Sequence, residues 1–332
     1  MNMYAWCKTA PSSGRTMPIL SFPGIQLMNV TVEKLVRDGA LQAQCMQAIH
    51  DRYDSLATVS LMDLSVEAEA FGSPIRFSME EVPTVLSAIV PDHEAAERLA
   101  IPPVGAGRTG EVLKGMALAS QRIKDRPVFA GMIGPFSLAG RLMDMTEIMI
   151  KCYDEPEDAH LVLEKATAFL ISYAKAFRET GCQGVVLAEP AAGLLSPDLI
   201  AEFSCPYVRR IIEAVQREDF LIVYHNCGNT LRLVDSILSI NAKAYHFGNV
   251  IDMAQMLPKI PTDRLVMGNV DPVSQFRNGT PDSIRAATLA LLSACGNYPN
   301  FIISSGCDIP PLSSWANIDA FFQAVRDFYA KG

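Results

Sequence analysis

One histidine and two cysteines have the spacing expected of a catalytic zinc site. His225 and Cys227 lie two positions apart at the end of an apolar run, and Cys307 follows another apolar run far downstream. Side chains two apart on a strand point to the same side, so the three can converge if the two strands lie near each other. Three such ligands suit Zn²⁺ and leave its fourth tetrahedral position open. The alternative is two buried thiols and a core histidine.

The ligand types indicate which reaction such a zinc ion would support. Zinc bound by two thiolates and one imidazole is electron-rich and therefore a modest Lewis acid for water. A thiol substrate suits it better, because coordination removes the thiol proton and leaves a reactive thiolate at neutral pH. The expected reaction is alkyl transfer to sulfur, with the metal generating the nucleophile.

Two carboxylates also follow apolar runs and are candidates for the same site. Glu189 could accept the proton of the thiol, orient a substrate or hydrogen-bond a zinc ligand. It could equally cap nearby backbone N–H groups. Asp63 carries the same ambiguity, as does Glu67, whereas Glu69 is expected to face solvent. Both Glu189 and Asp63 are taken forward as catalytic candidates.

Three further polar residues end later strands. His246 is predicted on the strand next to that of His225 and could be a fourth ligand or a proton carrier. A lone strand histidine is, however, more often a packed residue with one hydrogen bond. Asn269 and Asp271 end the seventh predicted strand, where barrels often bind phosphate groups, so both are candidates for cofactor binding.

Eight short apolar runs alternate with longer helical patterns, which predicts an α/β fold with a parallel sheet. The count matches the (β/α)₈ TIM barrel, and a doubly wound sheet is the main alternative. In a barrel, all the candidate residues above fall at the C-terminal ends of strands, where active sites lie. The predicted strands are Ile19–Phe22, Ser55–Met62, Val128–Ile133, Gly184–Ala188, Leu221–Tyr224, Ala242–Phe247, Leu265–Gly268 and Phe301–Ser304. The predicted helices are Val32–Arg52, Glu111–Lys124, Met145–Thr180, Pro197–Arg217, Leu231–Ile240, Met253–Leu257, Pro281–Ala294 and Ile318–Tyr329.

The chain is predicted to form one barrel domain over residues 18–332, after a frayed polar lead-in over residues 1–17. The stretch 63–124 is too long for one crossover connection and contains several prolines. It is therefore interpreted as an insertion after the second strand, serving as a lid or as one wall of the site.

Composition excludes several classes of function. A net charge of −8, from 28 basic and 36 acidic residues, argues against nucleic-acid binding, which needs basic patches. No run reaches about 18 uninterrupted apolar residues, so no membrane span is expected. The first residues have no apolar signal-peptide core, and the eight cysteines are read as reduced thiols of a cytoplasmic protein. A homo-oligomer is compatible with all of this.

Six short motifs are distributed along the chain, from near the second predicted strand to the end of the last one. They are Met62–Gly72, Gly134–Gly140, Glu189–Pro197, Tyr224–Gly228, Gly268–Pro272 and Gly306–Pro311. Together these motifs resemble the uroporphyrinogen decarboxylase superfamily. Within it, the chain is similar to the branch of methylcobalamin:coenzyme M methyltransferases and related corrinoid-dependent methyltransferases. The resemblance extends from about Pro18 to the C-terminus.

This resemblance implies a TIM barrel with zinc on His225, Cys227 and Cys307. It also implies an enzyme of one-carbon metabolism that takes a methyl group from methylcobalamin, usually carried on a separate small corrinoid protein. The acceptor would be a zinc-activated thiol such as coenzyme M, and cobalt would leave as Co(I). One departure concerns the stretch near Gly248 and Asn249, where the family is expected to have a carboxylate and this chain has none. The fourth ligand and the acceptor, another thiol or a pterin, therefore stay open.

Two alternatives remain beside this interpretation. Porphyrinogen decarboxylases carry an arginine-rich N-terminal motif that binds substrate carboxylates, and the corresponding stretch here, residues 20–26, has no arginine. A substrate with many carboxylates would thus lack its charge partners. The second alternative is a barrel that binds a corrinoid or tetrapyrrole without turnover.

Overall fold

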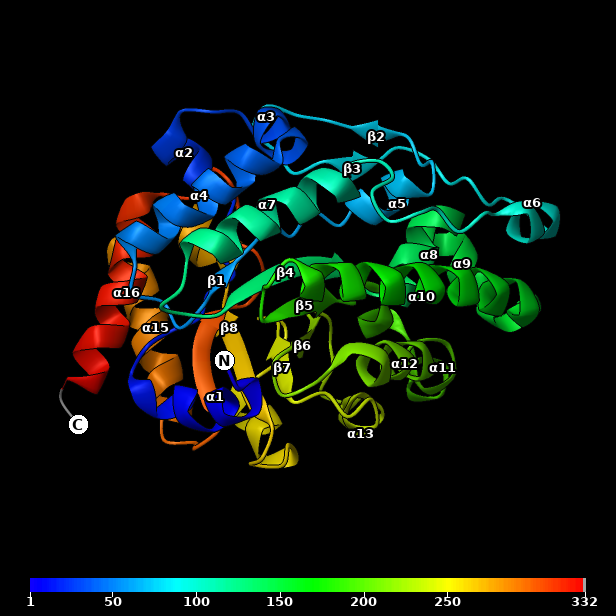
Figure 1. Cartoon of the computed structure of the whole chain (residues 1–332). Coiled ribbons are helices and arrows are strands. Elements are labelled where there is room, and N and C mark those ends of the chain that lie inside the picture. Colours follow the sequence, from blue (N-terminus) through cyan, green and yellow to red (C-terminus); the bar gives the residue numbers. More distant parts are fainter. Residues whose placement is uncertain (331–332) are drawn as a thin grey trace.

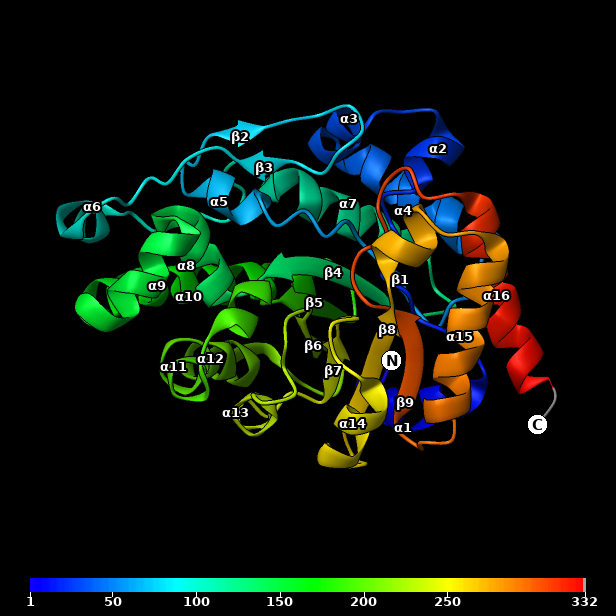
Figure 2. The same cartoon turned by 180° about the vertical axis from the view of Figure 1, so that it is seen from behind.

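A curved, entirely parallel sheet of seven strands forms the centre of the computed structural model, which describes residues 1–330 (Figure 1 and Figure 2). Helices surround the sheet, and neighbouring strands follow one another in chain order. The predicted α/β barrel architecture is confirmed, and seven of the eight predicted strands are present. In sheet order the strands are β1 (Thr58–Val59), β4 (Val128–Ile133), β5 (Gly184–Ala188), β6 (Leu221–Asn226), β7 (Ala244–Phe247), β8 (Leu265–Val270) and β9 (Phe301–Ser305).

The first predicted strand, Ile19–Phe22, is wrong. An irregular extended segment takes its place: Met17 donates a backbone hydrogen bond to Ile303 of β9 (3.3 Å), and Thr16 accepts one from Leu56 ahead of β1 (2.9 Å). The prolines that flank the predicted strand have no N–H group, so a regular ladder could not form through them. The segment nevertheless lies between the first and last strands and closes the barrel.

The N-terminal lead-in is also more ordered than predicted. Residues Met3–Thr9 form helix α1, followed by the 3₁₀ turn Ala10–Ser13, and the side chain of Asn2 accepts a hydrogen bond from the backbone of the first turn. Met3 is fully buried and packs in the cluster of apolar side chains that fills the barrel interior. The prediction of a frayed segment is wrong, because capping and burial hold this helix in place.

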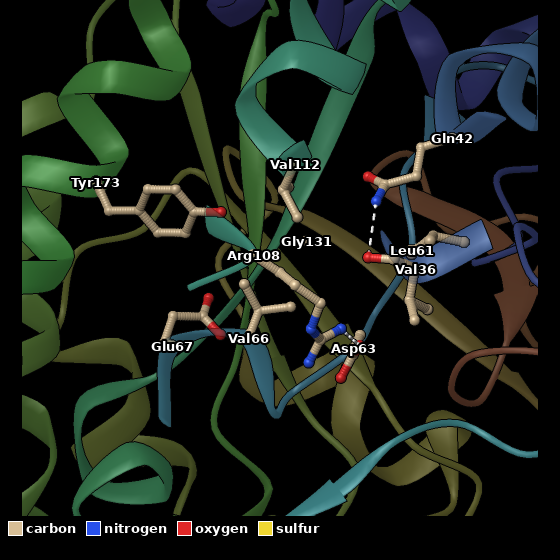
Figure 3. A pocket seen from close by; sticks show the side chains of 10 residues that line it. All are labelled: Val36, Gln42, Leu61, Asp63, Val66, Glu67, Arg108, Val112, Gly131 and Tyr173. Carbon is tan, nitrogen blue, oxygen red and sulfur yellow. Dashed lines mark hydrogen bonds and ion pairs between the residues drawn. The ribbon is translucent and has the colours of Figure 1, made fainter. Parts of the chain in front are cut away.

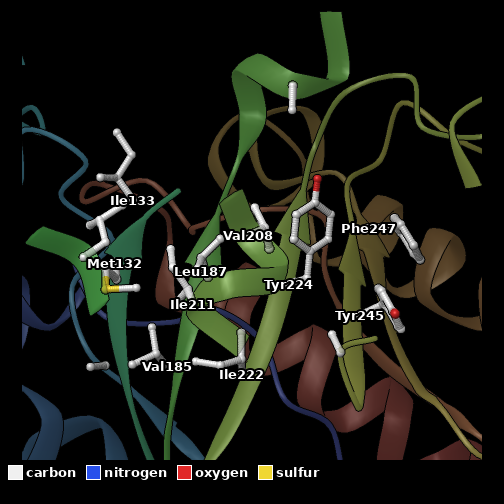
Figure 4. Close-up of a cluster of buried hydrophobic side chains, with 14 of the residues drawn as sticks. Met132, Ile133, Val185, Leu187, Val208, Ile211, Ile222, Tyr224, Tyr245 and Phe247 are labelled. Carbon is white, nitrogen blue, oxygen red and sulfur yellow. The ribbon is translucent and has the colours of Figure 1, made fainter. Parts of the chain in front are cut away.

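Strand side chains alternate between two apolar clusters. On β5 and β6, the residues Val185, Leu187, Ile222 and Tyr224 face outward and pack against helix α12 (Cys205–Val215), as Figure 4 shows. Residues between them face the barrel interior. This alternation places His225, which follows Tyr224, on the inner side.

Three long predicted helices are each broken into two. The breaks fall at Asp38, Glu155 and Ser204, and at the first of these the side chain of Asp38 accepts two backbone hydrogen bonds from the next helix. At the other two breaks a proline lies in the first turn of the following helix, Pro156 in α10 and Pro206 in α12. The helices are α2 (Gly24–Met28), α3 (Val32–Arg37), α4 (Gly39–Arg52), α7 (Thr109–Arg122), α8 (Pro135–Met143), α9 (Met145–Asp154), α10 (Pro156–Glu179), α11 (Pro197–Phe203), α12 (Cys205–Val215), α13 (Val234–Leu238), α14 (Met253–Met256), α15 (Pro281–Cys295) and α16 (Trp315–Tyr329).

The stretch after β1 forms a small layer beside the barrel mouth. It contains α5 (Val66–Ala70), the hairpin β2 (Ile75–Arg76) and β3 (Thr84–Val85), and α6 (His93–Arg98), and Figure 1 shows it extending toward α8 and α9. Two backbone N–H groups of this layer donate to the carbonyl of Leu142 in α8. Helix α7, which ends this stretch, packs against α4.

Among the helices within residues 1–330, none is both long enough and apolar enough to cross a membrane.

Candidate metal centre and the adjoining pocket

The three predicted metal ligands meet at the barrel mouth. Donor atoms of His225, Cys227 and Cys307 all lie within 4.8 Å of one another, and Nε2 of His225 is 3.5 Å from Sγ of Cys307. Their strands, β6 and β9, are not neighbours, so the curvature of the sheet brings the two strand ends together. Glycine allows this approach: a Cβ atom on Gly248 would lie only 2.4 Å from Cα of Cys227.

A chain of hydrogen bonds fixes the orientation of the imidazole of His225. Its Nδ1 lies 2.8 Å from Nδ1 of His246, whose Nε2 lies 2.8 Å from Oγ of Ser304. Ser304 donates to the backbone carbonyl of Met17 (2.7 Å), which can only accept. Each bond must therefore run in one direction: His246 donates to Ser304, and His225 donates from Nδ1 to His246. Nε2 of His225 is left without a proton and faces Cys307, which is the arrangement that a metal ligand needs.

This arrangement assigns His246 a supporting position. Both of its nitrogens form hydrogen bonds, one with His225 and one with Ser304. No nitrogen of His246 is therefore free to act as the fourth ligand that the sequence suggested. Burial is the main cause that lowers the pKa of His246 well below its ordinary value. The imidazole is thus neutral and able to accept a hydrogen bond at its Nδ1.

The two cysteines differ in their affinity for a proton. The hydrogen bond from Cys307 lowers the pKa of Cys227 to about 4, against the opposing effect of burial. The pKa of Cys307 is raised well above its ordinary value by the same pairing and by burial. A thiolate and a thiol therefore share one proton at neutral pH, and a divalent cation could take the place of that proton.

Of the roles predicted for Glu189, the structure shows the capping of backbone N–H groups. Its carboxylate is fully buried and accepts backbone hydrogen bonds from Phe136 (2.8 Å) and Ser137 (2.9 Å) at the start of α8, and another from the hydroxyl of Ser204. A side chain at position 134 would collide with it. Burial raises the pKa of Glu189 to about 7, against the opposing effect of these donors. With its oxygens committed to α8, Glu189 holds this helix against β5.

Asp63 lies in a closed ionic cluster rather than at the metal ligands. Its carboxylate pairs with the buried guanidinium of Arg108 and accepts a hydrogen bond from the backbone of Ser65 (3.0 Å). Glu69 pairs with the same arginine, so the expectation that Glu69 faces solvent is wrong. These pairs tie α5 to the start of α7. A catalytic role for Asp63 stays a prediction without a contact to support it.

A small cavity of about 10 Å³ lies beside this cluster (Figure 3). Glu67 and Tyr173 both line it, and Oε2 of Glu67 and the hydroxyl of Tyr173 have no hydrogen-bond partner among the described residues. Burial raises the pKa of Glu67 to about 8, although the backbone N–H of Ile133 donates to its other oxygen (3.1 Å). Glu67 is therefore a neutral acid in the folded protein at pH 7.

The side chains of Asn269 and Asp271 are bonded to their own chain. Asn269 donates to the carbonyls of Gly248 (2.9 Å) and Ile251 (2.8 Å), which ties down the loop after β7. Asp271 accepts backbone hydrogen bonds from the first turn of the following π-helix. These contacts are structural, and cofactor binding by the two residues stays a prediction.

A larger pocket opens directly beside the metal ligands, and it was missed in the sequence. Its volume is about 350 Å³, and Cys227 and Gly228 form one side of it. Arg141 on α8 lines another side, with Ser137 one helical turn earlier. The only sequence signal was the motif Gly134–Gly140 that immediately precedes this arginine. The remaining lining is apolar and includes Leu64, Ile133, Met145, Pro190, Ala191 and Leu194.

Comparison with known proteins gives consistent matches over the whole chain. The family model of uroporphyrinogen decarboxylase (URO-D) matches residues 17–328. A methylcobamide:CoM methyltransferase (MtbA) of Methanosarcina mazei is 26% identical over 329 residues, covering 95% of either chain. A uroporphyrinogen decarboxylase of Pseudomonas syringae pv. syringae is 25% identical over 293 residues, covering 85% of this chain and 81% of the relative. Among solved structures, a methyltransferase from Methanosarcina mazei superposes with a TM-score of 0.87 at 23% identity, covering 99% of this chain and 98% of the other.

Proposed function

The chain belongs to the uroporphyrinogen decarboxylase family, and from this premise we propose that it is a zinc-dependent methyltransferase. It moves a methyl group from a methylated corrinoid to a small thiol. The observation that carries the proposal is the convergence of His225, Cys227 and Cys307 beside a pocket of about 350 Å³. Similarity over nearly full length to a methylcobamide:CoM methyltransferase supports the same reaction.

The donor set fits zinc. One imidazole nitrogen without a proton and two sulfurs, one of them a thiolate at neutral pH, match the ligands that Zn²⁺ prefers, and the set leaves one position for a reactant. When bound, zinc would supply the positive charge that lets the thiol of the acceptor lose its proton at neutral pH. The chain of hydrogen bonds through His246 and Ser304 keeps the ring of His225 in its ligand orientation.

The reaction balances without a further reagent. The thiol gives up its proton, and its sulfur attacks the methyl carbon of the corrinoid. The carbon–cobalt bond breaks with its electron pair remaining on cobalt, which leaves as Co(I), and the product is a methyl thioether. The protein contributes by binding and orienting the thiol in the pocket beside Cys227, and by keeping water from it with the apolar walls around Leu64 and Ile133.

The face around the mouth suits a protein that delivers a corrinoid. Leu194, Val250 and Val273 follow strands β5, β7 and β8, so they lie at the same end of the barrel as the metal ligands. Their exposed fractions are 67%, 64% and 54%, which is high for apolar side chains. We infer that a small corrinoid protein docks here with its methyl group directed into the mouth.

Decarboxylation of a porphyrinogen has less support. Arg141 is the only cationic side chain that lines the pocket among residues 1–330, and a substrate with several carboxylates would need more partners. The paired sulfurs of Cys227 and Cys307 would also have no task in that reaction. A barrel that only binds a corrinoid differs from a methyltransferase in showing no demethylation of methylcobalamin.

The eight cysteines are all free thiols in the structure. This state suits a reducing compartment, and we propose the cytoplasm as the site of action.

The central experiment measures methylcobalamin demethylation by absorbance with a panel of thiols, together with the zinc content of the purified protein. One zinc per chain and thiol-dependent demethylation are expected, and Cys307→Ser should lose both. Cys7→Ser, at a half-buried free cysteine on α1, is the matched control and should lose neither. Methylcobalamin binding without turnover would favour the binding-only barrel. Turnover with a pterin alone would overturn the thiol assignment.

A further inference from the structure

Among residues 1–330, Arg141 is the one cationic side chain that lines a pocket whose walls are otherwise largely apolar. It lies on α8, between Ser137 one turn earlier and Met145 just beyond the helix end, and all three line the pocket. Its side chain is half-buried. An arginine in such a place has lost part of its hydration and is stabilised by an anion that can accept its fork of N–H groups.

No group of the described chain fills that role. The guanidinium of Arg141 forms no hydrogen bond and no ion pair within residues 1–330. Asp144 lines an adjacent hollow together with Arg141 but forms no ion pair with it. Its Oδ1 is engaged, because it accepts backbone hydrogen bonds from Thr146 (2.8 Å) and Glu147 (3.4 Å) at the start of α9. Arg141 is therefore available to a ligand in the pocket.

The rest of the pocket places this cation relative to the reaction. Cys227, a proposed zinc ligand, lines the same pocket, so one continuous space connects Cys227 with Arg141. Apolar side chains such as Leu64 and Ile133 form the walls between them. The position of Arg141 is fixed from the start of its helix, where Glu189 binds two backbone N–H groups of α8.

We propose that Arg141 binds the anionic group of the methyl acceptor, which makes the enzyme selective for short thiols that carry one sulfonate or carboxylate. The thiol end then faces Cys227 and the short carbon chain lies along the apolar walls. This inference rests on the proposed function. Arg141 acts here as a specificity residue, because it holds the end of the substrate that does not react.

The test compares three thiols of similar length with methylcobalamin as the methyl donor. The thiols are 2-mercaptoethanesulfonate (anionic), 2-mercaptoethanol (neutral) and cysteamine (cationic). The native enzyme should favour the anionic thiol over the neutral one by about 10- to 100-fold in kcat/KM, the range of a charged hydrogen bond. Arg141→Gln should bring this ratio close to one, and Arg141→Glu should shift the preference to cysteamine.

A binding measurement provides a readout without turnover. Calorimetry with the thioether product 2-(methylthio)ethanesulfonate should show an affinity about 10-fold or more weaker in Arg141→Gln. The matched control is Arg122→Gln, at an exposed arginine in the last turn of α7, which removes the same charge away from the pocket. It should behave as the native enzyme in both assays.

The outcomes separate this inference from the proposed function. If every thiol is methylated equally well and Arg141→Gln changes nothing, the anion site is wrong while the methyltransferase assignment stands. If no thiol is methylated but Arg141→Gln still weakens thioether binding, the anion site stands and the assignment fails. A rise in KM for methylcobalamin with an unchanged preference among thiols would assign Arg141 to the phosphate of the donor and overturn the inference.

Discussion

The direction of a hydrogen-bond chain decides what the two histidines do. The carbonyl of Met17 can only accept, so protons are donated from His225 to His246, from His246 to Ser304 and from Ser304 to Met17. His225 thereby presents a bare Nε2 on the side of Cys307. His246 fixes the tautomer of His225 and keeps no ring nitrogen of its own free, which is the position that outer partners of metal-bound histidines commonly have.

The first prediction tests this supporting role. His246→Phe removes the nearer acceptor of the N–H of His225 (2.8 Å) and leaves only the more distant backbone carbonyl of residue 246 (3.3 Å), while retaining an aromatic ring, so the affinity for zinc should fall about 10- to 100-fold. Ser304→Ala, one step further along the chain, should have a smaller effect. Competition with a chromogenic chelator measures both. Tyr245→Phe is the control, because this neighbour faces the outer core and its hydroxyl has no partner among the described residues.

The same series can contradict the interpretation. If His246→Phe binds zinc as tightly as the native protein, the orientation of His225 does not depend on its partner. If Ser304→Ala abolishes zinc binding while His246→Phe does not, the chain does not run in the direction deduced here.

The second prediction concerns the buried acid Glu67. Burial raises its pKa from 4.5 to about 8, so the folded protein retains a proton that the unfolded chain loses above pH 4.5. The stabilising contribution is therefore complete below pH 4.5 and is lost as pH rises toward 8, by up to about 4 kcal/mol. Urea denaturation between pH 5 and 8 should show this slope, and Glu67→Gln should flatten it.

Tyr173→Phe is the matched control for that slope. It removes the other unpartnered oxygen of the same cavity but no group that titrates in this range, since burial raises the pKa of Tyr173 well above 10. The slope should survive in this variant. A native protein whose stability rises from pH 5 to 8, with Glu67→Gln abolishing that rise, would mean that the carboxylate is stabilised as an anion.

Helix α8 is the element that connects the metal centre to the pocket. Its first turn is bound by the carboxylate of Glu189, and its next turn carries Arg141. The backbone of Glu189 is in turn bound to β6, where its N–H donates to the carbonyl of His225 (2.8 Å). Glu189 therefore ties helix α8, which lines the pocket, to strand β6, which carries His225.

The third prediction follows from this connection. Glu189→Gln places an amide donor against backbone N–H donors, so the free energy of unfolding should fall by about 1–3 kcal/mol. Zinc content should be retained, because the carboxylate does not touch the ligand side chains. Ser204→Ala, which removes one donor to the same carboxylate, should cost less. A large loss of turnover with unchanged stability in Glu189→Gln would instead support a catalytic proton transfer.

The helices and strands differ in how far the local sequence pattern alone predicts them. Strands such as Gly184–Ala188 and Phe301–Ser304 were predictable, because buried parallel strands are continuous apolar runs. The break at Asp38 was not, since the residues around it keep a helical pattern and only the capping contacts reveal the break. The first strand failed for a different reason: its apolar run had the right composition, but flanking prolines removed the hydrogen bonds of a ladder.

The candidate site divides in the same way. The convergence of His225, Cys227 and Cys307 was predictable, because two of them share a strand end and all three have chemistry that few other residue types share, and their donor atoms do lie within 4.8 Å of one another. Ser304 and Arg141 had no such signal, since a serine in a strand and an arginine in a helix are ordinary residues. Their importance depends on contacts that arise only when β7, β8 and β9 curl together and α8 docks.

At the scale of the whole molecule, the barrel depends on its N-terminal segment for closure. Thr16 and Met17 bridge the last and first strands, and Met3 on α1 fills the interior from the other end. The carbonyl of Met17 also ends the hydrogen-bond chain that orients His225. The segment that closes the barrel therefore also helps to orient His225, through the backbone carbonyl of Met17.

The last prediction concerns the apolar rim of the mouth, made of Leu194, Val250 and Val273. Val250→Asp and Val273→Asp place charges on this rim without touching the pocket lining. If a corrinoid protein docks there, its methylated form should show a KM raised about 10-fold by either change, because charged residues are depleted at the centre of such interfaces. Free methylcobalamin needs no docking surface, so its kinetic constants should stay unchanged. Tyr153→Asp, at an equally exposed side chain on the outer helix α9, is the control and should leave the KM for both substrates unchanged.

Light scattering of the same variants tests whether the apolar rim is used for self-association instead. A native dimer that becomes monomeric in Val250→Asp, with an unaltered KM for the corrinoid protein, would assign the rim to self-association and contradict docking of the corrinoid protein there.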